Sequence, residues 1–84
     1  MNNKVLIKVY VPTLDETYEV YIPTNETIKK ILELVVKLVS DFSDSDFGQN
    51  QERILVDSET ATPYSENVIV RDTDIRNSKL LILI

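Results

Sequence analysis

The side chains of this sequence that could do chemistry are mainly carboxylates, because the chain contains neither histidine nor cysteine. Without thiolates or imidazoles it lacks the usual zinc ligands and the side chain best suited to proton transfer near neutral pH. A single glycine also excludes a glycine-rich phosphate-binding loop. We therefore expect no catalytic residue, no cofactor and no enzyme activity.

The densest group of carboxylates lies between Asp41 and Glu52, and its spacing can be compared with that of a calcium-binding loop. A loop that begins at Asp41 would place Glu52 at the final ligand position, but serines replace carboxylates at two earlier ligand positions. Asp46 would occupy the position where the sharp turn of such a loop requires glycine. A loop that begins at Asp44 would place Gly48 one position too early. We interpret the segment as a solvated acidic loop and expect no metal site.

The charge of the chain restricts its partners. The 84 residues carry a net charge of -5, and the whole acidic excess lies after residue 39. Such a chain is repelled by phosphate backbones and by anionic membrane surfaces. No apolar stretch is long enough to span a bilayer, and the absence of disulfides favours a reducing compartment. We expect a cytoplasmic protein whose partner is another protein, with no nucleic acid and no direct membrane insertion.

The first part of the chain predicts a β-hairpin. Residues 4–11 alternate between apolar and mixed positions, with one phase formed by Val5, Ile7, Val9 and Val11. Pro12 cannot continue a hydrogen-bonded ladder, and residues 13–16 form a polar turn. A second strand over residues 17–22 places Tyr18, Val20 and Ile22 in one phase.

After Pro23 the apolar spacing changes to that of a helix, which we expect from Thr27 to Val39 with Thr27 as its N-cap. The apolar arc of this helix is wider than packing against one sheet requires, and it includes Leu34, Val36 and Leu38. Either the helix lies deep in a concave sheet, or one of these side chains contacts a partner.

The remaining segments predict a short strand over residues 53–56, a polar turn over 57–62, an edge segment at 63–64 and a final strand over 79–84. Residues 71–78 form a polar connection before this final strand. The expected fold class is α+β, with a mixed sheet of four or five strands packed on one main helix. We expect one domain that covers residues 1–84.

This order of elements resembles the ubiquitin-like β-grasp fold. The phases match its core positions at Ile7, Val9, Val20, Ile22, Ile28, Ile31 and Val35. The resemblance implies that Ile54 faces inward, that Leu55 faces outward, and that Ile75 fills the core before the closing strand. We expect the first and last strands to be parallel neighbours at the centre of the sheet.

Within that superfamily the chain resembles the small bacterial proteins of the YukD/EsaB type, which accompany type VII secretion systems in Gram-positive bacteria. The motifs are Lys-Val-Leu-Ile-Lys-Val-Tyr-Val-Pro at 4–12, Tyr-Glu-Val-Tyr-Ile-Pro at 18–23, Val-Arg-Asp-Thr-Asp-Ile-Arg-Asn at 70–77 and Leu-Ile-Leu-Ile at 81–84. A glycine often follows the asparagine in that family, where this chain has Ser78. The resemblance implies a non-catalytic accessory or regulator that binds other proteins, such as a component of the secretion system.

The alternative is a ubiquitin-like sulfur carrier or protein modifier. Those proteins end in a flexible Gly-Gly tail, whose slim carboxylate enters an adenylating enzyme. The sequence ends at Ile84 inside its predicted last strand, with bulky residues in place of the glycines. We therefore expect no conjugation or thiocarboxylate chemistry.

The candidate partner-binding site follows from strand phase. If one helix covers one side of the sheet, seven apolar residues face the other side: Leu6, Tyr10, Tyr21, Leu55, Leu80, Ile82 and Ile84. An exposed apolar patch of this kind usually marks an interface, here either with a partner protein or with a second copy in a homodimer. Two alternatives remain at this point. The aliphatic run 80–84 has no alternation to determine its register, and Lys8 and Glu19 could merely screen scattered aliphatics.

Overall fold

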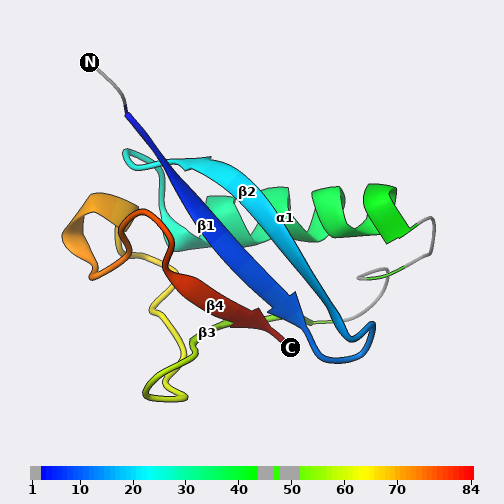
Figure 1. The fold of residues 1–84 in the computed structure, drawn as a ribbon. Helices are drawn as coiled ribbons and strands as arrows, with labels where there is room; N and C mark the ends of the chain where they lie inside the picture. The colour runs from blue at the N-terminus through cyan, green and yellow to red at the C-terminus, as the bar shows by residue number, and fades with distance from the viewer. Residues whose placement is uncertain (1–2, 44–46, 48–51) are drawn as a thin grey trace.

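The computed structural model describes residues 3–43, 47 and 52–84. Its four strands and its α-helix follow the predicted order, and a 3-10 helix that was not predicted lies between the last two strands (Figure 1). The elements are β1 (Lys4–Val11), β2 (Glu16–Pro23), α1 (Ile28–Ser43), β3 (Leu55–Asp57), η1 (Val70–Asp72) and β4 (Leu80–Leu83). The α+β prediction of a mixed sheet on one main helix is therefore confirmed.

The hairpin has the expected register. β1 and β2 pair antiparallel without a bulge from Lys4↔Pro23 to Val11↔Glu16. The turn is closed by a hydrogen bond from the Leu14 amide to the Val11 carbonyl, at 3.1 Å. The β-branched residues in both strands suit this extended backbone.

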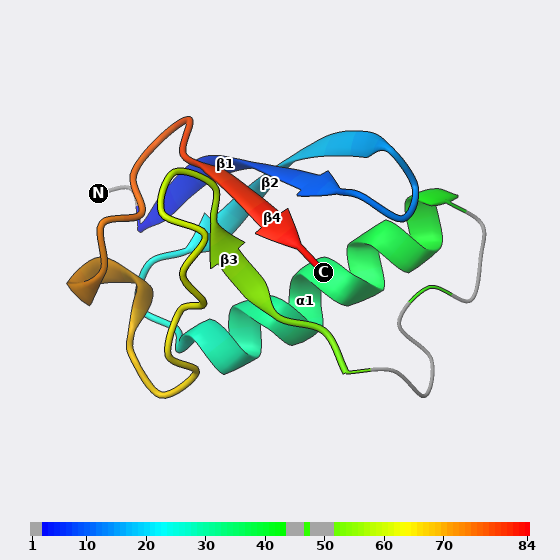
Figure 2. The same cartoon turned by 90° about the horizontal axis from the view of Figure 1, so that it is seen from below.

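The strand order in the sheet is β2-β1-β4-β3, and β4 runs parallel to β1 (Figure 2). Val9 lies beside Leu81 in this central pair. The Lys8 amide donates to the Lys79 carbonyl at 2.9 Å, and the Ser78 amide donates to the Leu6 carbonyl at 2.7 Å. The prediction that the first and last strands are central parallel neighbours is confirmed.

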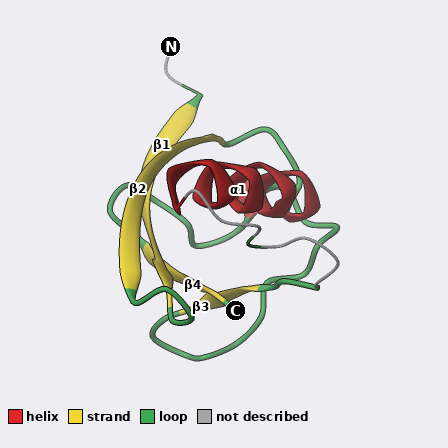
Figure 3. Cartoon of the chain, turned by 90° about the vertical axis from the view of Figure 1, so that its right-hand side faces the viewer, coloured by secondary structure: helices red, strands yellow, loops and turns green. Residues whose placement is uncertain are grey.

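Helix α1 crosses one face of the sheet, which curves around it (Figure 3). Its first turn is capped by Thr27, whose Oγ1 accepts a hydrogen bond from the Lys30 amide at 3.3 Å, as the sequence predicted. The helix ends at Ser43, one turn beyond the predicted end at Val39. The additional turn carries Phe42, whose ring stacks on Tyr18 of β2 with centroids 6.0 Å apart.

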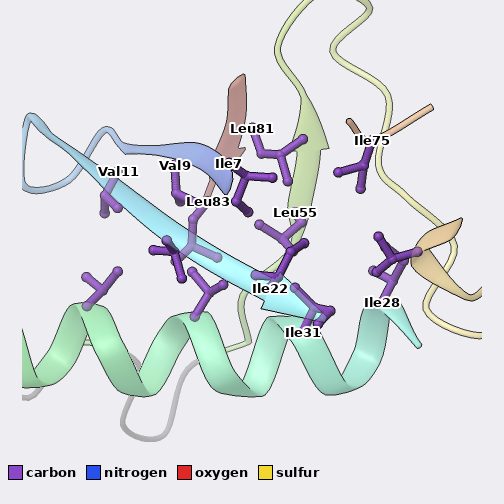
Figure 4. Packing of buried hydrophobic residues seen from close by; sticks show 14 of the residues in the cluster. Ile7, Val9, Val11, Ile22, Ile28, Ile31, Leu55, Ile75, Leu81 and Leu83 are labelled. Atoms are coloured by element: carbon purple, nitrogen blue, oxygen red, sulfur yellow. The ribbon is translucent and has the colours of Figure 1, made fainter. Parts of the chain in front are cut away.

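The core lies between the helix and the inner face of the sheet (Figure 4). Ile28, Ile31, Val35 and Val39 of α1 are buried against the inner residues of β1, β2 and β4. Ile75 is buried before β4 begins, as expected. Residues 71–78 were expected to form a polar connection, and Arg71 and Asp72 of this segment belong to η1, which begins at the buried Val70.

The phase of the third strand is where the sequence interpretation was wrong. Leu55 was expected to face outward, yet it is only 2% exposed and pairs with Leu83, whose side chain points into the core. Ile54 was expected to face inward, and it is 42% exposed. The sequence Arg-Ile-Leu-Val contains no polar residue among its last three positions, so nothing in it determines which residues face the helix.

Most of the acidic segment between Asp41 and Glu52 lies outside the described residues. Residues 41–43 were expected to lie in the acidic loop, but they form the end of α1. For the rest of the segment, the interpretation as a loop without calcium stays a prediction.

Candidate protein-interaction face

The side of the sheet that faces away from α1 is called the open face. Strand phase places the following residues on it: Lys4, Leu6, Lys8, Tyr10, Thr17, Glu19, Tyr21, Pro23, Ile54, Val56, Leu80, Ile82 and Ile84. Their immediate neighbours along each strand point toward the helix, because side chains alternate between the two sides of a strand.

Strand register brings the apolar residues of this face together. In the hairpin, Leu6 lies opposite Tyr21, and Lys8 lies opposite Glu19. The next contacts are between β1 and β4, where Tyr10 lies beside Ile82.

The apolar row continues into β3. Val56 lies opposite Ile82 in the antiparallel pair. Ile54 and Ile84 exchange two backbone hydrogen bonds of 2.9 and 3.1 Å. The open face therefore carries apolar side chains from all four strands, interrupted near its centre by Lys8 and Glu19.

Four of these apolar side chains are exposed to solvent. Tyr21 is 63% exposed, Ile84 47%, Ile54 42% and Leu80 39%. The other predicted members of the face, Leu6, Tyr10 and Ile82, are half-buried. Exposed apolar side chains that gather on one uncovered side of a sheet are typical of an interface.

Comparison with the predicted site gives one correction and one addition. Leu55 does not belong to the face, because it lies in the core. Ile54 takes its place, and Val56 lies on the same side but is nearly buried. The last strand has the predicted phase, since Leu81 and Leu83 are buried while Leu80 and Ile84 are exposed. The sequence held no signal for the addition, because a charged residue is expected to face water, and an outward Asp57 goes with an outward Leu55 and an inward Ile54. The structure reverses these assignments.

A second feature is a polar cluster at the end of β3 and the start of β4. Lys79 Nζ lies 3.3 Å from Asp57 Oδ1 and 3.3 Å from Asp74 Oδ2. The Tyr64 hydroxyl donates to Asp74 Oδ1 at 3.0 Å. The nearly buried Asp57 also accepts a hydrogen bond from the Glu59 amide at 2.8 Å. This cluster satisfies the one buried carboxylate of the described core.

The pKa values in this cluster are shifted away from neutral pH, so the cluster stabilises the structure and is poorly suited to acid–base chemistry. The Glu59 amide, and then Lys79, hold the pKa of Asp57 below its ordinary value. Burial opposes the charge of Lys79, but its hydrogen bonds to Asp57 and Asp74 outweigh this and raise its pKa. Burial, followed by the hydrogen bond to Asp74, raises the pKa of Tyr64. Asp57 and Lys79 are therefore ionised and Tyr64 is neutral at pH 7.

A smaller polar contact lies beside the open face. The Tyr10 hydroxyl donates to Asp15 Oδ1 at 2.9 Å, and this hydrogen bond is the main reason that the pKa of Tyr10 is raised. Tyr10 therefore presents an uncharged ring next to Ile82. Among the described residues there is no group of three side chains that could hold a metal ion. In the same part of the chain, no helix is long and apolar enough to cross a bilayer.

A mixed sheet in the order β2-β1-β4-β3 on a single helix is the architecture of ubiquitin-like β-grasp domains, and solved structures bear this out. No family model and no curated protein matches the sequence. The chain is similar to the EccD5 ubiquitin-like domain of Mycobacterium xenopi, with a TM-score of 0.79 at 12% identity, covering 98% of this chain and 93% of that one.

Two further solved structures show how widely the fold is used. A chain of the MycP5-free ESX-5 inner membrane complex matches with a TM-score of 0.78 at 11% identity, over 98% of this chain. The match spans only 21% of that longer chain. A chain in a toluene 4-monooxygenase complex matches with a TM-score of 0.76 at 6% identity, over 95% of both chains. These TM-scores establish the ubiquitin-like fold. Because the sequence identities are so low, the function has to be argued from the surface of this protein.

Proposed function

We propose that this protein is a non-catalytic module that binds another protein through its open face, and that the partner is a component of a type VII secretion system. The observation that carries the proposal is the exposure of Tyr21, Ile54, Leu80 and Ile84 on the uncovered side of the sheet. Transfer of such side chains out of water contributes roughly 25 cal/mol per Å² of apolar surface, from which the entropic cost of association is subtracted.

The choice of partner rests on likeness. A ubiquitin-like domain of EccD5 and a chain of the ESX-5 inner membrane complex share this fold over almost the whole length of the protein. The motifs of the YukD/EsaB type in the sequence point in the same direction. On this proposal the protein acts in the cytoplasm as an accessory or regulator of the secretion machinery, and it works through contacts.

The test compares two leucines of nearly equal exposure on different surfaces. Leu80, on the open face, is 39% exposed, and Leu34, on the helix, is 38% exposed. Tagged wild-type, Leu80→Asp and Leu34→Asp proteins are expressed in a host that carries a type VII system. Each is captured from detergent-solubilised cells, and the bound proteins are identified by mass spectrometry.

We expect subunits of the secretion complex with the wild type and with Leu34→Asp, and their loss with Leu80→Asp. Circular dichroism should show that both variants remain folded, since neither leucine lies in the core. Capture of the same subunits by folded Leu80→Asp would refute the open face as the site. A wild-type homodimer in light scattering that Leu80→Asp dissociates would assign the face to a second copy.

A further inference from the structure

The strand β2 forms an edge of the sheet, and its backbone is open to a further strand. The carbonyl of Leu6 and the amide of Lys8 bond toward β4, so alternate residues of β1 bond toward β2. Their antiparallel partners on β2 use their own backbone groups in this ladder. The intervening residues Thr17, Glu19 and Tyr21 therefore point their amides and carbonyls away from the sheet.

This edge has few of the devices that usually prevent strand addition. β2 is eight residues long, pairs with β1 without a bulge and contains no lysine, and its only charged side chains are Glu16 and Glu19. Its proline, Pro23, stands at the end of the strand. The opposite edge is protected, because β3 has three residues and Val56 makes a bridge with Pro63. Long regular edges with these properties readily pair with another chain.

An apolar ridge of α1 runs beside the open edge. Phe42 stacks on Tyr18 of β2 with an interplanar angle of 14°, which places this flank of the helix next to β2. Leu38 and Leu34 precede Phe42 by one and two turns on the same flank. Leu34 is 38% and Phe42 65% exposed.

The spacing of the ridge matches that of a strand. Residues four apart on a helix are separated by about 6 Å along its axis. Alternate residues of a strand, which share one face, are separated by about 6.6 Å. Alternate side chains of a strand added to β2 can therefore meet Leu34, Leu38 and Phe42 in turn.

The end of the ridge at Phe42 favours a cation. A hollow of about 410 Å³ lies there, lined by Leu14, Glu16, Tyr18, Phe42 and Ser43. The last turn of α1 contains no basic residue, so nothing within that turn offsets the partial negative charge of the helix end. Two stacked aromatic rings beside the Glu16 carboxylate suit a guanidinium group, which stacks on rings and pairs with carboxylates.

We propose that β2 accepts an extended segment of another protein as an additional antiparallel strand, and that an arginine of this segment enters the hollow beside Tyr18, Phe42 and Glu16. The segment has the pattern apolar-x-apolar-x-Arg, and its apolar residues pack on Leu34 and Leu38. The edge of β2 with the ridge of α1 beside it and the open face are different surfaces, so this inference does not depend on the proposed function.

The probe is a fluorescein-labelled peptide of about ten residues, long enough to span β2, that alternates valine and threonine and ends in the sequence Val-Thr-Arg. A second peptide replaces arginine with uncharged citrulline. A third carries N-methyl groups on the amides that would face β2. Binding is measured by fluorescence anisotropy and by amide chemical shifts of the ¹⁵N-labelled protein.

We expect the arginine peptide to shift the amide signals of Thr17, Glu19 and Tyr21. The citrulline peptide and the Phe42→Ala variant should each weaken binding roughly fivefold to tenfold, the factor that a partly desolvated cation–π contact supplies. N-methylation should abolish binding, and the open-face variant Leu80→Asp should bind as the wild type does.

Three results would overturn the proposal. They are equal affinity for the arginine and citrulline peptides, undiminished binding of the N-methylated peptide, and no binding of any peptide up to about millimolar concentration. Shifts confined to Leu80 and Ile54 would also count against it, because they would place the peptide on the open face. Thermal melts of Phe42→Ala confirm that the variant is folded, as the exposure of its ring predicts.

Discussion

Leu55 and Ile54 are neighbours in sequence whose side chains lie on opposite sides of the sheet. Replacing each with alanine should therefore lower the free energy of unfolding by different amounts. Leu55 is 2% exposed and belongs to the core cluster, whereas Ile54 is 42% exposed. Truncating a buried leucine removes its transfer free energy and leaves a cavity, at a cost of about 3 kcal/mol. Truncating Ile54 removes atoms that already contact water in the free protein, and should cost less than about 1 kcal/mol.

The backbone contributes little to this difference. The Tyr64 amide donates to the Leu55 carbonyl at 3.1 Å, and the Ile54 amide donates to the Ile84 carbonyl at 2.9 Å. Alanine retains both bonds, so the two variants differ mainly in side-chain packing.

The assay is urea unfolding followed by far-ultraviolet circular dichroism, with thermal melts alongside. For a domain of this size each kcal/mol shifts Tm by about 4–8 °C. Leu55→Ala should therefore lower Tm by roughly 12–24 °C, and Ile54→Ala by less than about 8 °C. An Ile54→Ala variant that is destabilised as much as Leu55→Ala would show that the phase of β3 given above is incorrect.

Three further predictions concern the turn before β4 and the polar cluster. Ser78 has a φ of 71°, in the left-handed region that favours glycine, so Ser78→Gly should raise the free energy of unfolding by about 0.5–1 kcal/mol and Ser78→Ala should not. If Ser78→Gly is no more stable than Ser78→Ala in urea unfolding, the backbone of Ser78 is not strained by its positive φ. Asp57 has a lowered pKa in the folded state, so its stabilising effect is present above its unfolded pKa near 4 and is lost as the pH falls below it. The stability advantage of the wild type over Asp57→Asn should therefore shrink between about pH 6 and about pH 3, and a constant difference in urea midpoints would contradict this linkage. Tyr64 and Lys79 have raised pKa values, so their contribution is complete below about pH 10 and is lost as the pH rises further, which melts between about pH 9 and about pH 11.5 should show.

The fold was largely predictable because most elements carry a strong pattern. The alternation in residues 4–11 and 17–22 determines the phase of the hairpin, and helical spacing after Pro23 determines the buried side of α1. Thr27 marks the start of the helix through its hydroxyl. The end was misplaced because Phe42 is held by Tyr18, a contact between distant residues that helical spacing alone does not reveal.

The candidate site was only partly predictable, because two of its strands are uniformly aliphatic. Leu80 and Ile84 were placed correctly although the run 80–84 has no alternation that determines its register. Leu55 was misplaced because three consecutive aliphatic residues fit either phase. The phase of β3 is determined by the pairing of Leu55 with Leu83, a contact between strands that the sequence of β3 alone does not reveal.

The surface beside β2 was partly visible in the sequence. The wide apolar arc of the helix left open whether Leu34, Val36 or Leu38 contacts a partner. The structure separates them, since Leu34 and Leu38 share the flank that carries Phe42, while Val36 belongs to the opposite flank. Only the position of Phe42 beside Tyr18 identifies the flank that lies along the strand edge.

The pairing of β1 with β4 has a consequence for folding of the chain during its synthesis on the ribosome. β1 is made early and β4 late, yet the two strands form the centre of one sheet. The hairpin and α1 can form as the chain emerges, but one edge of β1 stays bare until Leu80–Leu83 has been synthesised. Contacts between such distant segments slow folding, and unpaired edges invite aggregation in the meantime. A nascent chain halted before Leu80 should remain open to protease, and arrival of the last strand should confer protection in a single cooperative step.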